Sequence, residues 1–278
     1  MPGRAAYPVR MSEFIACAVS QFAPTLDRVE NLETLGEHAA LAVSRGATIL
    51  VAPEYAAAFD KEPGEWMREH AEPLDGPFVA GVSQLTAELG ITIIASLLER
   101  SEEPDGKPYN TVFAVGPEGR LLGSYRKVHL YDAFGAGESE WLQAGDADAA
   151  PVVVDGGPFR IGLQTCYDLR FPEVSRRLVD AGADVLAVPA EWVRGPLKEH
   201  HWTTLLQARA IENTAYVVAA DHPAPIGVGR SAIVDPRGIE VSALGSEVGV
   251  AVAWLDAQTI ANVRRQNPAL ELRRYGVA

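Results

Sequence analysis

Cys166 is placed where a catalytic nucleophile could act. It is one of two cysteines in the chain and follows a short apolar run, residues 159–165, before a segment that begins with Pro172 and Glu173. Proline suits the first position of a helix and an acid suits its positive end, so the pattern predicts a strand, a turn and a helix. A thiol at such a turn lies near free backbone N–H groups, which can lower its pKa and hold an oxyanion. The alternative is a buried cysteine that fills a gap in the core.

Two other strand-like runs also end in charged residues. Residues 48–53 lead into Glu54, and residues 121–125 lead into Arg126 and Lys127. In layered α/β proteins, ligands collect outside the carboxyl ends of strands. A base, a cation and a nucleophile would meet there. Taken alone, Glu54 could be a surface acid and Lys127 a solvated lysine, but the apolar residues around Glu54 favour burial, and a buried glutamate needs a partner.

These segments resemble the motifs of the nitrilase or carbon–nitrogen hydrolase superfamily, whose catalytic set is Glu-Lys-Cys. The matching stretches occur in the family's order at residues 53–55, 125–130, 166–173 and 208–213. The resemblance implies an α/β fold, a four-layer α-β-β-α sandwich of the nitrilase type. It also implies cysteine-dependent hydrolysis of a non-peptide C–N bond through a thioester acyl-enzyme.

The resemblance gives each of these residues a role. Cys166 attacks the amide carbon, while Glu54 takes the thiol proton, passes it to the leaving amine and later activates water. Lys127 stabilises the oxyanion together with the backbone N–H after the cysteine. The family often has a second glutamate that holds the lysine, and the matching position is Glu138. Glu140 remains an alternative, because a change of one or two residues in the loop would exchange the two.

The residues around the nucleophile also suggest a substrate. The Tyr-Asp-Leu-Arg-Phe that follows Cys166 looks like the amidase branches that act on ω-amides of small dicarboxylates. A small aliphatic or ω-amide, converted to carboxylate and ammonia, is therefore the first candidate. N-carbamoyl hydrolysis, nitrile hydrolysis, ammonia supply to a synthetase partner, and a catalytically silent binding protein on the same fold remain alternatives.

Three residues are expected to contact the substrate. Tyr167 follows the nucleophile, and Trp192 and Arg194 lie in a loop, residues 189–196, that follows a strand end. Trp192 would form a wall of the pocket and Arg194 would meet a carboxylate. The alternative is that the two loop residues belong to the surface rim.

Other candidate sites lack the pattern that their chemistry needs. His200 and His201 are adjacent and would point about 100° apart on a helix, and the chain has no His-x-x-x-His or Cys-x-x-Cys pair. Gly227-Val228-Gly229 lacks the third glycine of a dinucleotide loop. We therefore expect no metal and no cofactor. Arg170 and Arg209 are expected to form internal ion pairs.

The elements that must position these residues are short strands interleaved with helices. Apolar runs predict strands at residues 15–22, 48–52, 91–97, 110–115, 152–154, 159–165, 185–189, 216–220, 231–234 and 248–254. Apolar stripes at helical spacing occupy residues 32–43, 78–89 and 202–210, and a fourth helix is expected over 256–266 with Asp256 as its N-cap. This order predicts sheets covered by helices, whereas the number of layers comes only from the resemblance.

Composition limits the protein class. The chain has 278 residues, 47% of them hydrophobic, and no linker divides it, so we expect a single domain over residues 11–278 after an irregular extension at 1–10. The net charge of −13 argues against nucleic acid or an anionic membrane as partner. Two cysteines fit a reducing compartment, and neither a signal peptide nor a run of ~20 apolar residues occurs. A cytoplasmic protein with a small amide substrate is expected.

The C-terminal stretch, residues 264–275, suggests an assembly. Pro268 ends the last predicted helix, and Leu270, Leu272 and Tyr275 need a surface to cover them. The resemblance implies that such tails cross to a neighbouring subunit. Symmetric dimers are also the commonest oligomers, so we expect a homodimer or a larger even-numbered assembly. The alternative is a frayed terminus.

Overall fold

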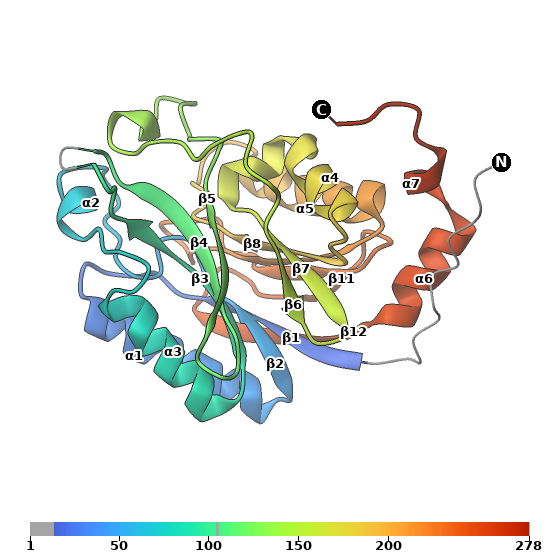
Figure 1. Cartoon of the computed structure of the whole chain (residues 1–278), viewed down its shortest axis with the longest axis horizontal. Coiled ribbons are helices and arrows are strands. Elements are labelled where there is room, and N and C mark those ends of the chain that lie inside the picture. The colour runs from blue at the N-terminus through green and yellow to red at the C-terminus, as the bar shows by residue number, and fades with distance from the viewer. Residues whose placement is uncertain (1–13, 104–105, 278) are drawn as a thin grey trace.

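Two six-stranded sheets stacked face to face form the middle of the molecule (Figure 1). The computed structural model describes residues 14–103 and 106–277, so the extension expected at 1–10 lies outside the described residues. The first sheet has the spatial order β12 (Gly249–Asp256), β1 (Phe14–Gln21), β2 (Ala47–Val51), β3 (Thr92–Glu99), β4 (Tyr109–Val115) and β5 (Leu121–Arg126). The second has the order β11 (Glu240–Ala243), β10 (Ala232–Val234), β9 (Tyr216–Ala220), β8 (Val185–Pro189), β7 (Phe159–Leu163) and β6 (Val153–Gly156).

Helices cover both outer faces of this pair of sheets. The first sheet packs against α1 (Arg28–Ser44) and α3 (Pro77–Leu89), and the second against α4 (Pro172–Asp180) and α5 (Lys198–Asn213). The four-layer α-β-β-α sandwich is therefore confirmed. The other helical segments are α2 (Trp66–Glu69), α6 (Ala257–Gln266), α7 (Ala269–Leu272) and two 3-10 turns, η1 (Glu138–Glu140) and η2 (Cys166–Arg170). In Figure 1, α6 and α7 lie to one side of the sandwich.

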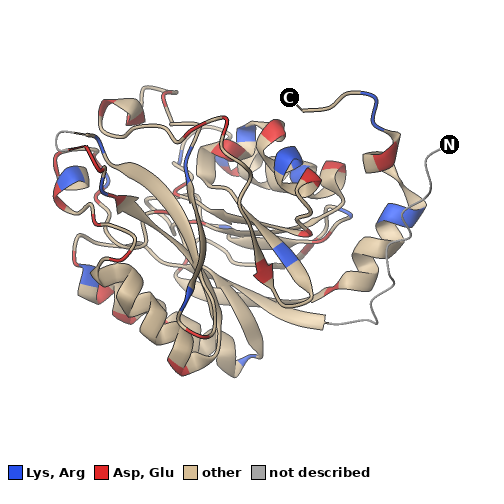
Figure 2. Ribbon diagram, viewed as in Figure 1, with Lys and Arg blue, Asp and Glu red and all other residues tan. Residues whose placement is uncertain are grey.

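Successive residues of a central strand alternate between two layers of core, as the geometry of a strand requires. In β1, Ala16 and Ala18 belong to the apolar cluster shared with α1 and α3, whereas Cys17 and Val19 lie between the sheets. Charged residues lie mainly on helices and loops (Figure 2). An apolar layer between the sheets thus holds them together.

The predicted strands are present with ends shifted by at most two residues, whereas α1 and α5 each begin four residues before the apolar stripes that predicted them. β3 continues to Glu99 because its last residues pair with β4, and the Glu99 carboxylate forms an ion pair with Arg126 at 2.6 Å. The predicted N-cap of α6 is confirmed, since the Asp256 carboxylate accepts a hydrogen bond from Gln258 N at 2.9 Å. In the described ranges, no helix is long and apolar enough to span a membrane.

Candidate active site

Glu54, Lys127 and Cys166 follow the carboxyl ends of β2, β5 and β7, respectively. β2 and β5 run in the same direction, because β3 is parallel to β2 and the next two strands each reverse direction. The backbone N–H of Glu54 donates to the carbonyl of Ala190, just beyond β8 of the second sheet, at 3.2 Å. The sandwich therefore brings side chains from both sheets to one edge.

Lys127 is the centre of a buried ionic cluster. Its side chain is only 2% exposed, and its Nζ donates to Glu54 Oε1 at 3.1 Å and to both carboxylate oxygens of Glu138 at 2.9 Å. Burial alone would lower the pKa of the Lys127 ammonium, but the carboxylates of Glu138 and Glu54 outweigh burial and raise the pKa well above its usual value. Lys127 therefore carries a fixed positive charge.

The two carboxylates differ in their surroundings. Glu138 accepts hydrogen bonds from Tyr55 Oη at 2.7 Å and Tyr131 N at 2.5 Å as well as from Lys127. Burial alone would raise the pKa of Glu138, but the Lys127 charge and these hydrogen bonds lower it. Burial raises the pKa of Glu54, although the Lys127 charge opposes the rise. Environments that separate the pKa values of two acids allow one to stay ionised and the other to carry a proton, and of these two acids Glu54 is the one whose pKa is raised.

Other contacts hold Glu54 in place. Its Oε1 accepts from Asn110 Nδ2 at 2.7 Å, and its Oε2 accepts from the backbone N–H of Glu191 at 2.7 Å. Burial lowers the pKa of His222 to about 4, so its ring is neutral and Nε2–H donates to the Glu54 carbonyl at 2.7 Å. The side chain and the backbone of Glu54 are therefore both fixed.

Cys166 is the first residue of η2 and has a strained backbone. Its φ of 40° lies in the left-handed region, which a residue other than glycine adopts at a cost and which is typical of functional turns. Cys166 is buried, with 7% of the residue exposed, and its thiol donates a hydrogen bond to the carbonyl of Glu191, with Sγ and oxygen 3.4 Å apart. Burial and the Glu54 carboxylate raise the pKa of the thiol well above its usual value, against the charge of Lys127. The expectation that local N–H groups lower this pKa is wrong for the free protein.

Asp168 ties the turn of the nucleophile to β5. It is fully buried, and its carboxylate accepts from Thr165 N at 3.2 Å, Tyr125 Oη at 2.8 Å and His129 N at 3.3 Å. These bonds join the residue before Cys166 to the strand that ends before Lys127. The nucleophile and the cation are thus positioned by one network.

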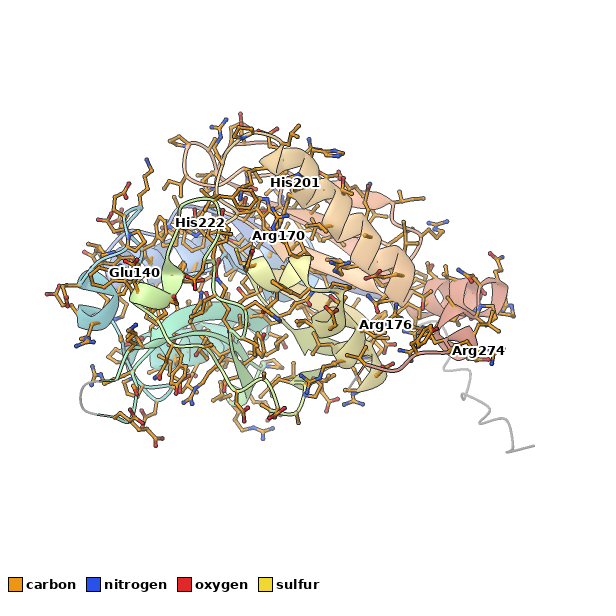
Figure 3. All side chains as sticks on the ribbon, turned by 90° about the horizontal axis from the view of Figure 1, so that it is seen from above. Glu140, Arg170, Arg176, His201, His222 and Arg274 are labelled. Carbon is orange, nitrogen blue, oxygen red and sulfur yellow. The ribbon has the colours of Figure 1, made fainter. Side chains whose placement is uncertain are left out.

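The two candidate acids of the loop can be separated by mutation. Glu138 contacts Lys127, whereas Glu140 is exposed and lies two residues farther along η1 (Figure 3). Glu138→Gln is expected to lower kcat/KM for an amide by roughly 10²-fold, because Lys127 loses its ionic support and shifts. Glu140→Gln is expected to remain near the unaltered rate. Ammonia release measures both, and the reverse ranking would show that Glu138 does not support Lys127.

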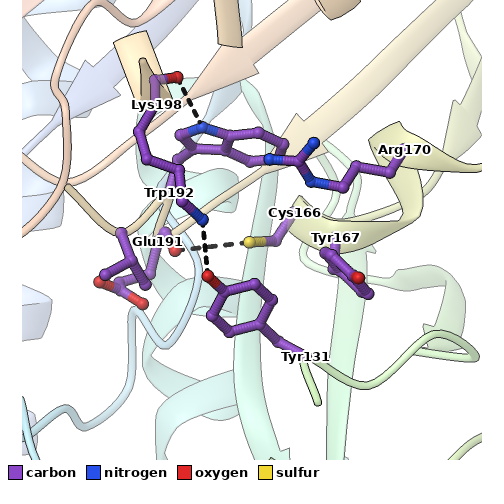
Figure 4. A pocket seen from close by; sticks show the side chains of 8 residues that line it. Tyr131, Cys166, Tyr167, Arg170, Glu191, Trp192 and Lys198 are labelled. Atoms are coloured by element: carbon purple, nitrogen blue, oxygen red, sulfur yellow. Dashed lines mark hydrogen bonds between the residues drawn. The ribbon is translucent and has the colours of Figure 1, made fainter. Parts of the chain in front are cut away.

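A small pocket opens at the thiol. It is lined by Tyr131, Cys166, Tyr167, Arg170, Glu191, Trp192, Val193 and Lys198 (Figure 4). Tyr167 and Trp192 therefore lie where substrate contacts are expected. Arg194 is exposed and does not line this pocket, so its predicted contact with a carboxylate finds no support in the geometry. The cations in the pocket are Arg170 and Lys198.

The two arginines expected in ion pairs behave differently. Arg209 pairs with Glu212 at 2.9 Å, as predicted. Arg170 has no carboxylate within 4.0 Å among residues 14–103 and 106–277, so the prediction for Arg170 is wrong. Its guanidinium lies over the Trp192 ring, 4.8 Å from the centroid, and its Nη2 is 3.3 Å from Nδ1 of His201 (Figure 3). The structure places Arg170 at the active site.

Several site residues were not predicted. Three of them contact the Glu54–Lys127–Glu138 cluster: Asn110 from β4, Tyr55 from the turn after β2, and Glu191 from the loop after β8. Lys198 begins α5, where a positive charge is unfavourable to the helix dipole, and this conflict was the one local signal available. In the described part of the chain, no group of three or more His, Cys, Asp or Glu residues has the arrangement of a metal site.

Comparison with known proteins extends this picture. The model of the family described as carbon–nitrogen hydrolase matches residues 16–265. A deaminated glutathione amidase of Escherichia coli O157:H7 is 36% identical over 258 residues, which cover 93% of this chain and 97% of that protein. The human deaminated glutathione amidase is 34% identical over 275 residues, 92% of this chain and 81% of that protein.

Solved structures agree with the fold. Saccharomyces cerevisiae Nit3, a member of branch 10 of the nitrilase superfamily, superposes with a TM-score of 0.83 at 26% identity over 94% of this chain and 97% of its own. An amidase from Nesterenkonia sp. AN1 in complex with acrylamide gives a TM-score of 0.80 at 27% identity over 94% of both chains. Another structure of that amidase shows covalent addition of the acetamide moiety of fluoroacetamide at the active site cysteine, with a TM-score of 0.77, 26% identity and coverage of 93% and 97%.

Proposed function

The chain belongs to the carbon–nitrogen hydrolase family, in its amidase branch, and from this premise we propose that it hydrolyses a small amide by a thioester route with Cys166 as nucleophile. The first candidate substrate is a small aliphatic or ω-amide, which would give a carboxylate and ammonia. The observation that carries the proposal is the buried Glu54–Lys127–Glu138 cluster beside the Cys166 thiol.

Acylation begins with a proton transfer. The raised pKa of the thiol keeps Cys166 protonated until substrate binds, and the raised pKa of Glu54 makes its carboxylate the acceptor of that proton. The sulfur attacks the amide carbon, and the carbonyl oxygen becomes an oxyanion. Lys127 and the backbone N–H of Tyr167 stabilise it. Glu54 then protonates the nitrogen as the C–N bond breaks, leaving a thioester on Cys166.

Deacylation reverses these roles. Once the amine has left, Glu54 is again a carboxylate and takes a proton from water, which attacks the thioester carbon. The second oxyanion forms at the same position as the first, so Lys127 serves both halves of the reaction. Collapse of this intermediate releases the acid and returns the proton from Glu54 to the Cys166 sulfur. Glu138 keeps its negative charge throughout and holds Lys127.

The substrate class is tested with a panel of compounds on the full-length protein. The panel contains ω-amides of small dicarboxylates, neutral aliphatic amides, N-carbamoyl amino acids, nitriles and deaminated glutathione. Ammonia is measured for the primary amides, and the released amine is measured for deaminated glutathione. The highest kcat/KM is expected for an amide.

The other outcomes separate the alternatives. A preference for nitriles or N-carbamoyl compounds would replace the substrate assignment but keep the thioester route. Absence of turnover and of any acyl adduct on Cys166 by mass spectrometry would favour a catalytically silent binding protein. Each result leaves the family membership unchanged.

We further propose that residues 11–278 act as one domain that assembles into a homodimer or a larger even-numbered oligomer. Leu270 packs on the cluster between the second sheet and its helices, and Arg273 pairs with Asp180 of α4. Leu272 and Tyr275 nevertheless remain 63% and 91% exposed. The C-terminal segment is thus held in place by some residues while its exposed apolar side chains remain available. Such exposed apolar groups are typical of a surface that contacts a second subunit.

Deleting the residues after Asn267 is expected to weaken the assembly and to lower the melting temperature, because the Leu270 and Arg273 contacts are lost. Light scattering measures the first effect and thermal unfolding the second. The matched control, Leu272→Ser with Tyr275→Ser, keeps the anchors and is expected to affect mainly the assembly. A monomer at micromolar concentration of the full-length chain would contradict the proposal.

A further inference from the structure

Lys198 is a buried cation without a carboxylate partner. It is only 6% exposed, yet no Asp or Glu oxygen lies within 4.0 Å of its Nζ in the described part of the chain. Among the described residues, the one hydrogen bond of this ammonium goes to Tyr131 Oη at 2.6 Å. Buried lysines are rarely left unpaired, because removing the charge from water is costly. The fold therefore buries the Lys198 charge without supplying a counterion for it.

Two further features make this position unfavourable for a cation. Lys198 is the first residue of the 16-residue helix α5, where the dipole is positive. The second cation, Arg170, lines the same pocket, and its Nε is buried with no hydrogen-bond partner among residues 14–103 and 106–277. Burial and the Arg170 charge together lower the pKa of Lys198. Such conflicts without internal compensation are typical of functional sites.

Aromatic rings offset only part of this cost. Lys198 Nζ lies 4.0 Å from the centroid of Phe134 and 4.8 Å from that of Tyr131. Cation–π contacts are weaker than a hydrogen-bonded carboxylate, and Phe134 is itself exposed. The rings therefore form the walls of a site around the cations and leave the N–H donors free for another group.

Glu191 is the only acid among the described residues that line the pocket, and its carboxylate oxygens lie more than 4.0 Å from the side-chain nitrogens of Lys198 and Arg170. Burial, together with the charges of Glu54 and Asp221, raises the pKa of Glu191 well above its usual value. Its backbone also serves the catalytic residues, since Glu191 N donates to Glu54 and Glu191 O accepts from Cys166. The pocket beside the thiol is thus locally positive in a chain of net charge −13.

From these observations we propose that Lys198 and Arg170 form an anion subsite that binds a carboxylate of the substrate, and that Lys198 determines specificity for anionic amides. One small pocket is lined by Lys198, Arg170 and Cys166 (Figure 4). A single small substrate could therefore place its carboxylate at the two cations and its scissile amide at the Cys166 thiol. The inference rests on the proposed amide hydrolysis. It assigns to Lys198 the role that the sequence had suggested for Arg194.

The test compares an anionic amide with a neutral amide of the same length. Glutaramate carries a carboxylate, and 5-oxohexanamide has the same length with a methyl group in place of one carboxylate oxygen. The unaltered protein is expected to prefer glutaramate in kcat/KM. Lys198→Met is expected to reduce kcat/KM for glutaramate roughly 10- to 100-fold, mainly through KM, because a hydrogen bond to a charged group is lost. The rate on 5-oxohexanamide should stay within about threefold, a much smaller change than loss of the charged hydrogen bond produces.

Two controls accompany this variant. Lys198→Arg keeps the charge and is expected to retain most of the preference. Lys61→Met removes an exposed lysine that does not line the pocket, and kcat/KM for both amides should stay unchanged. Thermal unfolding verifies that each variant is folded. Equal losses on both amides in Lys198→Met would mean that Lys198 only supports the structure of the pocket, and would overturn the proposal.

A binding measurement separates this inference from the proposed function. Calorimetry with the Cys166→Ala protein, with and without Lys198→Met, measures the affinity for both amides without turnover. Charge-selective binding that depends on Lys198 supports the subsite even if no amide is hydrolysed. Equal affinities for the anionic and the neutral amide would overturn the proposed subsite even if amides are hydrolysed.

Discussion

Replacing Cys166 with alanine is expected to abolish amide hydrolysis while the protein stays folded. The thiol is the only group that the proposed route gives to the substrate carbon, and removal of a nucleophile typically lowers kcat by roughly 10⁴-fold or more. The side chain is small and the turn is held by the Asp168 network, so the fold is expected to persist. Ammonia release and thermal unfolding measure the two effects.

Cys17 provides the matched control, because it is the other cysteine of the chain and is also buried. It lies between the sheets in β1, away from the pocket. Cys17→Ala is expected to keep its activity with a modest loss of stability, about 1 kcal/mol for a small cavity. Mass spectrometry after exposure to a slowly hydrolysed amide should find the acyl adduct in Cys17→Ala and not in Cys166→Ala. Substantial turnover by Cys166→Ala would remove the proposed mechanism.

Lys127→Gln is expected to have the second largest effect. Loss of a positioned oxyanion donor costs about 10²–10³ in rate. Lys127 is also the counterion that separates the Glu54 and Glu138 carboxylates, so activity should fall by at least this amount. Breaking a buried ion pair from one side should also destabilise the fold by about 3–5 kcal/mol.

The same variant should show a distinctive pH dependence. Without the ammonium, burial and mutual repulsion would raise the pKa of the acid pair in the folded state above its unfolded value. A folded state that binds more protons becomes less stable as pH rises. Lys127→Gln should therefore be more stable at mildly acidic pH and lose stability as the pH rises through the raised pKa. Unfolding by urea at several pH values measures this slope.

A double variant separates the catalytic from the structural role of Lys127. Lys127→Gln with Glu138→Gln removes both charges of the pair and should recover part of the lost stability. Its rate should remain low, because the oxyanion still lacks its cation. Recovery of the rate together with stability would show that Lys127 acts only on the fold.

The sequence predicted the frame of this molecule better than its site. Alternating apolar residues and helix signals are local, and they placed β1, β8, β9 and α6 within one or two residues. The layer count came only from the resemblance, because the pairing of two sheets depends on contacts between distant residues. For the same reason, nothing in the sequence pointed to Asn110 as a partner of Glu54, whereas the charged residues after two strand-like runs had indicated Lys127.

Two errors at the site have a common physical cause. The pKa of Cys166 was expected to fall because of local N–H groups, but burial and the distant Glu54 carboxylate raise it. Arg170 was expected to have an acidic partner, yet the fold leaves it facing Trp192 and Lys198 in the pocket. In both cases the electrostatic environment is set by residues far away in the chain, and sequence patterns do not report it.

The reactive groups are divided between two sheets, and this division has a consequence for robustness. Glu54 and Lys127 are carried by the first sheet and Cys166 by the second, and apolar packing together with a few hydrogen bonds, such as those of Asp168, aligns one sheet with the other. A small lateral slip would separate thiol from base while every strand stayed paired. The turnover rate therefore depends strongly on how the two sheets are aligned. In mild denaturant, the rate should fall at a lower denaturant concentration than the β-strand content. Substitutions in the middle layer are accordingly limited by catalysis as well as by stability.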